Sequence, residues 1–220
     1  MIIAFNEVDY FRVSSDIDEI ERIARTCYKT EDKISNDSAE KFVKMLVQRG
    51  HTAMLEFVDL IFKFTTDRGV THELVRHRLA SYAQESTRYC NYSKGRFSNQ
   101  CTFILPVEFF KVDQRTDSLY LSWKAACTEA EKWYLDMIKG GASPQLARSV
   151  LPNSLKTEIN VKANLTEWRH IFLLRCSKAA HPQMRDLMLQ ALYLTHNRVP
   201  VVFDDIFNLH KEEINDIVRR

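Results

Sequence analysis

Side chains that bind anions follow one another in one short stretch of the chain. Arg76, His77 and Arg78 are adjacent, and Ser86 and Arg88 follow them closely. Arginine stays protonated in proteins and presents five donors in a planar fork, so arginines that converge suit a multiply charged partner such as a phosphate. The stretch therefore predicts a binding site for an anion.

The same residues also have a plain structural explanation. Neighbouring residues on a helix point about 100° apart, so Arg76, His77 and Arg78 could fan out into solvent at a helix end, where the helix dipole favours cations. Runs of charge are usually solvated faces. Spacing within the triplet alone leaves both explanations open.

The wider pattern around the triplet is more specific. An Arg-His-Arg triplet at 76–78 is followed by seven residues and then by Ser86, with the pair Arg88-Tyr89 just beyond. This string resembles the signature of the flavin-dependent thymidylate synthases, and the resemblance extends from the region of His51 to a helix that carries Arg175. It implies an enzyme that methylates dUMP to dTMP without a cysteine nucleophile. Methylenetetrahydrofolate would donate the one-carbon unit, and FAD reduced by NADPH would supply the hydride.

The resemblance also implies roles for individual residues. Arg175 is the implied catalytic residue, a fixed guanidinium beside N3 and O4 of the uracil, where a preorganised donor is worth about 3 kcal/mol. The residues implied to bind dUMP are Glu73, Arg76, Gln84, Glu85, Ser86, Thr87, Arg88, Arg148 and Arg175. Those implied to bind FAD are His51, Arg76, His77, Arg78, Gln84, Asn164 and His170. Arg88 and Arg148, with Ser86 between them, suit the phosphate of dUMP.

Two positions near His51 depart from the family pattern. The family carries a histidine and a following glutamate, which match His51 and Glu56. Ala53 stands where a hydroxylated residue is common, and Phe57 where a histidine is common, so cofactor hydrogen bonds from these two positions are missing. A histidine just after a helix is more often a cap or a packing residue than a catalyst. His181 matches a less strictly spaced family position, and no role is assigned to it.

Composition limits the kinds of partner. The 220 residues carry a net charge of only +2, so the arginines are a local concentration and not part of the basic surface of a nucleic-acid binder. The five glycines form neither G-x-G-x-x-G nor a P-loop, so side chains and helix ends would have to hold the phosphates of a nucleotide cofactor. We expect no nucleic-acid partner.

The cysteines and the apolar segments indicate the compartment. The five cysteines contain no C-x-x-C pair, and the residues from Met1 to Glu7 lack the pattern of a signal peptide. No apolar run approaches the length of a membrane span. We therefore expect reduced thiols and a cytoplasmic protein without a membrane partner.

Hydrophobic periodicity predicts an α+β fold: one domain over residues 1–220, with a mostly antiparallel or mixed β-sheet flanked by helices. Strands are expected at 2–13 (with a turn at Asn6-Glu7), 58–65, 101–105 and 155–163. Helices are expected at 16–27, 39–48, 69–79, 117–139, from Ser143-Pro144 to Pro152, at 167–176 and at 182–197. A polar loop is expected at 81–97, and a strand-like run with a polar tail at 200–220. The resemblance further implies a homotetramer with sites shared between subunits.

Three other functions remain open at this point. An RNA-binding module could use the segment 76–97, with aromatic rings that stack on bases and basic side chains that hold phosphates; the residues are Tyr82, Arg88, Tyr89, Tyr92, Lys94, Arg96 and Phe97. A phosphohydrolase could use His77, but no metal-ligand pattern supports it. A structural α/β subunit could carry the arginines as surface charges.

Overall fold

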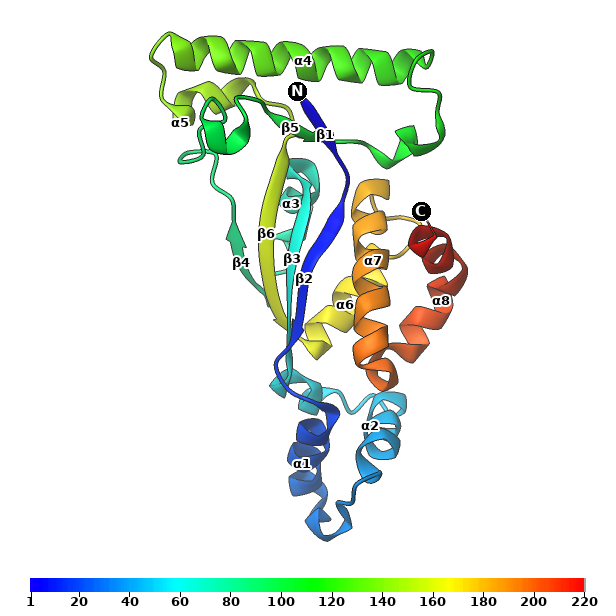
Figure 1. The fold of residues 1–220 in the computed structure, drawn as a ribbon. Coiled ribbons are helices and arrows are strands. Elements are labelled where there is room, and N and C mark those ends of the chain that lie inside the picture. Colours follow the sequence, from blue (N-terminus) through cyan, green and yellow to red (C-terminus); the bar gives the residue numbers. More distant parts are fainter. Residues whose placement is uncertain (220) are drawn as a thin grey trace. The chain divides into compact units, whose positions relative to one another are not determined.

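A computed structural model of the chain describes residues 1–219 (Figure 1). The strands are β1 (Ile2–Ala4), β2 (Glu7–Val13), β3 (Asp59–Asp67), β4 (Ser81–Gln84), β5 (Thr102–Ile104) and β6 (Lys156–Asn164). The α-helices are α1 (Ile17–Tyr28), α2 (Ser38–Gln48), α3 (Arg68–Leu74), α4 (Ser118–Lys139), α5 (Pro144–Ala147), α6 (Leu165–Arg175), α7 (Pro182–Arg198) and α8 (Pro200–Val218). The predicted α+β class is confirmed.

The strands form two sheets. One has the order β2-β3-β6-β4, and the other pairs β1 with β5 in parallel. An isolated antiparallel bridge joins Phe103 of β5 to Leu155, so the pairing is mixed, as expected. Alternate residues of β3 and β6 are buried, for example Leu60 and Phe62 in β3 and Ile159 and Val161 in β6. This alternation is the two-residue period of a strand with one face in the core.

The contacts within the chain group into two compact units. Unit 1 contains residues 1–7, 64–76 and 83–159, and unit 2 contains residues 8–63, 77–82 and 160–220, of which residue 220 lies outside the described range. The chain passes between the units after residues 7, 63, 76, 82 and 159, so each unit is built from distant segments. The prediction of one domain over residues 1–220 stays a prediction, as does the homotetramer.

Unit 1 has an aromatic and sulfur-rich core. Phe103 of β5 and Tyr134 of α4 are fully buried in it, together with Cys101 and Cys127. The neighbouring Trp133 is exposed. Adjacent residues on a helix point about 100° apart, so one of the two rings faces away from the core.

Unit 2 is centred on Trp168 of α6. Its ring packs on Phe62 of β3 with a centroid distance of 4.7 Å and lies 5.4 Å from Phe172. Its Nε1 donates a hydrogen bond of 3.1 Å to the backbone oxygen of Leu60, so the polar atom of this buried ring is satisfied. Helices α7 and α8 pack against each other in the same unit (Figure 1).

The last segment differs from the prediction. The run expected as a strand from residue 200 is helix α8, which begins with Pro200 in its first turn. Val202, Ile206 and Ile214 are buried along it, a spacing that fits one face of a helix. The local preference of Val-Val-Phe for extended backbone is overridden by packing against α7.

Two further boundaries differ around the Arg-His-Arg triplet. Helix α3 ends at Leu74 instead of residue 79, and Leu79 is exposed. Strand β4 occupies part of the segment expected as a loop at 81–97. The helix expected after Ser143 is divided into α5 and a 3-10 turn at Arg148–Val150, and the strand expected at 2–13 is interrupted at Asn6, as predicted. The other expected helices and strands begin and end within two residues of their predicted bounds.

Helix capping gives a stability test with a matched control. Asp117 accepts a hydrogen bond of 2.7 Å from the backbone N–H of Tyr120 at the start of α4, whereas Asp37 stands at the same position before α2 without such a bond. We expect Asp117→Ala to lower the free energy of unfolding by about 1 kcal/mol and Asp37→Ala by no more than a few tenths. Urea denaturation of both variants measures this, and equal losses would contradict the capping assignment.

Candidate functional site

The two arginines of the triplet and its histidine face different surroundings. Arg76 and Arg78 are exposed, whereas His77 is 5% exposed. The segment leaves α3 immediately after buried Leu74, so the three residues do not continue the helix. The plain explanation, in which all three side chains fan into solvent, therefore fails for His77.

In unit 1, residues predicted to bind the dUMP phosphate are gathered from distant segments. Arg148 Nη1 donates a hydrogen bond of 3.0 Å to Oγ1 of Thr87, which is 4% exposed. Arg88 Nε donates at 3.0 Å to Oε1 of Gln145, three residues before Arg148. Ser86 Oγ accepts from the backbone N–H of Arg88 at 3.3 Å. Thr87 and Gln145 thus join the loop after β4 to the segment of α5.

Gln84 ties three elements of unit 1 together. Its Nε2 donates to Oγ1 of Thr71 in α3 at 2.9 Å and to Oγ1 of Thr157 in β6 at 3.2 Å. Both threonines are fully buried. Glu73, also predicted to contact dUMP, lies on the same short helix as Thr71.

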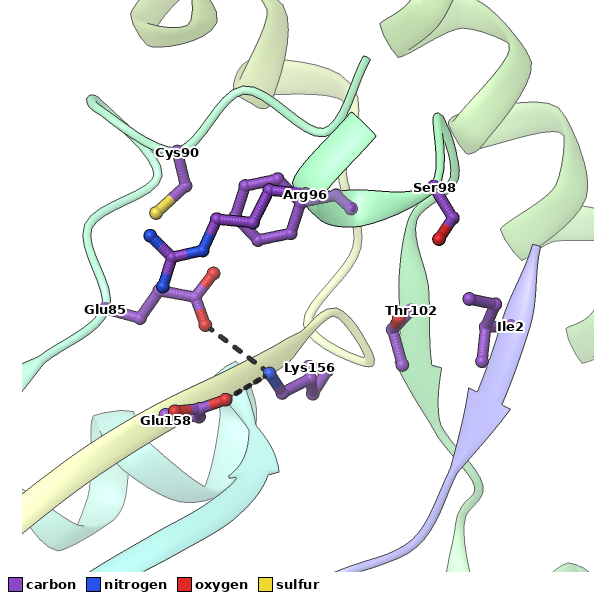
Figure 2. Close-up of a pocket in the computed structure, with 9 residues that line it drawn as sticks. Ile2, Glu85, Cys90, Arg96, Ser98, Thr102, Lys156 and Glu158 are labelled. Carbon is purple, nitrogen blue, oxygen red and sulfur yellow. Dashed lines mark hydrogen bonds and ion pairs between the residues drawn. The ribbon is translucent and has the colours of Figure 1, made fainter. Parts of the chain in front are cut away.

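Glu85 is held by its surroundings on several sides. Its backbone oxygen accepts from Arg68 Nη2 at 2.8 Å, and its carboxylate accepts from the hydroxyl of Tyr92 at 3.0 Å. Figure 2 shows Lys156 between Glu85 and Glu158, at 3.8 and 2.6 Å from their carboxylate oxygens. Glu85, Lys156 and Glu158 line a cavity of about 360 Å³. The bonds fix the backbone just before Ser86.

Four of the five cysteines have thiol pKa values that are raised above the ordinary value. Burial raises the pKa of Cys101 and Cys176 to about 12 and that of Cys127 to about 11. Burial, and then Glu85 nearby, also raise the pKa of Cys90. The nucleophile is the thiolate, so these four thiols are poor nucleophiles near neutral pH.

Unit 2 contains a second cluster, built around His77. Arg175 Nε, at the last residue of α6, donates a hydrogen bond of 3.0 Å to His77 Nε2. Glu167 Oε1 lies 3.6 Å from the other ring nitrogen, Nδ1. His170 presents its ring 5.8 Å from that of His77, and Tyr82 donates its hydroxyl proton to the backbone oxygen of His77 at 2.7 Å.

Helix α6 explains how three of these side chains converge. Asn164 caps its start by accepting a hydrogen bond of 2.8 Å from the backbone N–H of Glu167. Glu167 and His170 are three residues apart and lie on the same face, and Arg175 closes the last turn, where the helix dipole favours a cation.

The cluster keeps His77 uncharged. Burial, followed by the charges of Arg175 and His170, lowers the pKa of His77 to about 4. Because Arg175 donates to Nε2, we place the proton of the neutral ring on Nδ1, facing Glu167. Burial also raises the pKa of Glu167, and burial together with Glu167 raises that of Tyr82 to about 12.

His51 belongs to another part of unit 2. It follows Gly50, which has a left-handed φ of 71° after helix α2, as expected for a helix stop. The hydroxyl of Tyr28 lies 2.6 Å from His51 Nδ1. The ring of Phe57, one of the two departures from the family pattern, is exposed.

Three residues that organise these clusters received no site role from the sequence: Glu167, Gln145 and Tyr28. Thr87 was predicted to bind dUMP but not to accept a hydrogen bond from Arg148. Glu167 fits the last position of a capping box that begins at Asn164, but its spacing of three residues from His170 also indicates that both side chains share one helix face. Gln145 and Tyr28 carry no sequence signal, since their partners are distant in the chain.

Two general findings concern metal sites and membrane spans. Within residues 1–219 there is no group of three or more histidine, cysteine or acidic side chains that could hold a metal ion. None of the helices in this range is long and apolar enough to cross a membrane.

The shifted pKa of His77 predicts a pH-dependent stability. The unfolded chain protonates His77 below about pH 6.5, and the folded protein only below about 4, so stability falls as the pH drops through this window. We expect the free energy of unfolding to lose about 2 to 3 kcal/mol more between pH 7 and 4.5 in the native protein than in His77→Gln. Glu167, with its raised pKa, acts in the opposite direction but is present in both proteins.

Denaturant titrations of both proteins at the two pH values measure the difference. Equal losses would mean that His77 titrates normally. The charged or titratable groups facing His77 in unit 2 are Tyr82, Glu167, His170 and Arg175.

A search of solved structures gives the fold a close match. The chain superposes on the crystal structure of a UMP/dUMP methylase, PolB from Streptomyces cacaoi, bound with 5-Br dUMP. The TM-score is 0.77, and the match covers 95% of this chain and 97% of the other at 20% sequence identity. At that identity the likeness concerns the fold.

Sequence comparisons identify the family. The family model described as thymidylate synthase complementing protein matches residues 11–201. The flavin-dependent thymidylate synthase of Pyrococcus furiosus is 35% identical over 162 residues, 73% of this chain and 64% of the relative, so the chain spans less than two thirds of that protein. The flavin-dependent thymidylate synthase of Geobacter sulfurreducens is 31% identical over 189 residues, covering 83% and 78%. The resemblance carried by the Arg-His-Arg signature is thereby confirmed, and the chain belongs to the flavin-dependent thymidylate synthase family.

Proposed function

We propose that this chain catalyses the reductive methylation of dUMP to dTMP, with methylenetetrahydrofolate as one-carbon donor and NADPH-reduced FAD as hydride source. Membership of the family supports the proposal. The observation that carries it is the grouping of Arg88 and Arg148, distant in sequence, through Thr87 and Gln145 in one unit.

The dUMP phosphate would bind to this arginine group. Arg88 and Arg148 are both exposed, and each is oriented by a bond through one nitrogen of its guanidinium. A phosphate that carries nearly two negative charges forms charge-assisted hydrogen bonds with guanidinium groups, and these bonds are stronger than hydrogen bonds between neutral groups. Ser86 offers a hydroxyl beside them, and Glu73, Arg76, Gln84, Glu85 and Thr87 are proposed to complete the nucleotide site.

Arg175 would polarise the uracil ring. When N3 loses its proton, negative charge spreads over the ring towards C5, and a fixed guanidinium beside N3 and O4 stabilises that charge. The bond from Nε to His77 holds the guanidinium in one plane. No cysteine adduct is required, in keeping with the raised thiol pKa values of Cys90, Cys101, Cys127 and Cys176.

The residues present suit FAD. The cofactor carries a diphosphate, which requires cations and N–H donors, and Arg76, Arg78 and His170 are exposed. Bound FAD would supply the hydride. We propose His51 and Asn164 as further FAD contacts and Gln84 as a residue shared with dUMP. His77 is also predicted to contact FAD, but both of its ring nitrogens face side chains of its own unit.

We also propose that residues 1–220 work as one domain in a cytoplasmic homotetramer with shared sites. Five passages of the chain between the two units support a single folding domain, because neither unit is a continuous segment.

The RNA-binding alternative is weakened by the aromatic residues it needs. Tyr92 is 4% exposed and its hydroxyl is bonded to Glu85, so its ring is not available to stack on a base. The hydroxyl of Tyr82 donates a hydrogen bond to the backbone oxygen of His77, so the side chain of Tyr82 is held against the protein.

The class of function is tested by colour and turnover. Purified protein is expected to be yellow, to lose its flavin absorbance on addition of NADPH, and to form dTMP from dUMP and methylenetetrahydrofolate. Colourless protein that takes up no added FAD, or flavoprotein that forms no dTMP, would overturn the proposal.

The phosphate assignment is tested by Arg88→Ala. Loss of one charge-assisted contact to the phosphate should raise the KM for dUMP by about 10- to 100-fold and leave the FAD content unchanged. Arg115→Ala is the matched control, because Arg115 is exposed in the same unit and pairs with Asp113. Steady-state kinetics with varied dUMP measures both, and an unchanged KM in Arg88→Ala would remove Arg88 from the phosphate site.

A further inference from the structure

We propose that His77 is a positioning residue for Arg175, and that Glu167 fixes His77 in turn. The inference rests on the proposed role of Arg175 in dUMP methylation and adds to it how the guanidinium is oriented. His77 acts through Arg175 and is not assigned a contact with the substrate. The three side chains form one chain of contacts within unit 2.

The bond to His77 restricts the most mobile part of Arg175. An arginine side chain has several rotatable bonds, so its fork is oriented only when neighbouring groups hold it. The acceptor is a ring nitrogen 3.0 Å from Nε. The guanidinium is planar. A hydrogen bond that holds Nε therefore also restricts the directions in which the two terminal nitrogens, Nη1 and Nη2, can point.

His77 is itself rigid. Its ring is 5% exposed, and its backbone oxygen accepts the hydroxyl proton of Tyr82 at 2.7 Å. A buried ring with an anchored backbone cannot swing away from Arg175 without opening the core. The position of the acceptor atom, His77 Nε2, is therefore fixed by the packing of the protein around the ring.

Glu167 determines which ring nitrogen accepts. A carboxylate 3.6 Å from Nδ1 favours the proton on that nitrogen and leaves the lone pair on Nε2 for Arg175. Glu167 and Arg175 lie on the same helix, α6, about two turns apart. The imidazole thus bridges two positions of one rigid element.

The charge state suits this role. With its pKa lowered to about 4, His77 keeps an acceptor at neutral pH. A protonated ring would offer only donors and would repel the guanidinium. A histidine acting as general acid or base would instead need a pKa near the working pH.

The test compares two substitutions of different hydrogen-bonding capacity. In His77→Gln the side-chain oxygen can replace Nε2 as acceptor, whereas in His77→Leu no acceptor remains. We expect His77→Leu to lower kcat on the order of 100-fold, with a KM for dUMP and an FAD content close to those of the native enzyme, because misorientation of a reacting group carries losses of this size. His77→Gln should recover most of kcat. Equal kcat in the two variants would refute the positioning role.

A double-mutant cycle separates positioning from a general effect on folding. If His77 acts only through Arg175, His77→Leu should cost little further activity in an Arg175→Ala background. A full additional loss of kcat would mean that His77 acts independently. Melting temperatures of all variants show whether any loss comes from unfolding, and His77→Gln provides a folded comparison.

A readout that does not depend on activity keeps this inference apart from the proposed function. Crystal structures of the native protein and of His77→Gln should show Arg175 in one orientation, and that of His77→Leu should show it displaced or in several orientations. An unchanged, ordered Arg175 in His77→Leu would overturn the inference even if the enzyme makes dTMP. A protein that makes no dTMP would overturn the proposed function, while the structures would still decide the role of His77.

Discussion

The hydrogen bond between the buried, uncharged imidazole of His77 and the guanidinium of Arg175 is the constraint on which the chemistry proposed for unit 2 depends. The guanidinium stays protonated in a protein and can only donate, so an imidazole can accept from it only while the imidazole is uncharged. Burial achieves this by lowering the pKa of His77, and it does so without a carboxylate that would cancel the positive charge of Arg175. The cation therefore keeps its charge for a ligand while its direction is fixed.

Each of the two units contains arginines that suit an anionic ligand. Unit 1 holds Arg88 and Arg148, whose exposed forks suit a dianionic phosphate. Unit 2 holds Arg175, which is proposed to stabilise a uracil ring that becomes anionic only during the reaction, and whose Nε is held by His77. The signature segment is the place where the chain passes between the units, after residues 76 and 82, so one short motif contributes to both.

Much of this arrangement could be read from the sequence, and the limits have physical causes. The spacing of the Arg-His-Arg motif is recognisable because it is a local pattern. The capping role of Asn164 is recognisable for the same reason, from its spacing of three residues to Glu167. Helix α8 was missed because its β-branched start favours extended backbone, and only packing against α7 makes it helical. The burial of His77 between two exposed arginines was not predictable either, because it depends on Glu167 and on Arg175, which lies 98 residues further along the chain.

The distribution of thiols has a practical consequence for handling the protein. Cys101, Cys127 and Cys176 are buried, whereas Cys27 is exposed near the end of α1. Maleimide and related reagents attack the accessible sulfur fastest, so a fluorophore or spin label would attach first at Cys27 and only slowly at the shielded positions. The native chain thus carries its most exposed thiol in unit 2, at Cys27, as the first attachment point for spectroscopic probes.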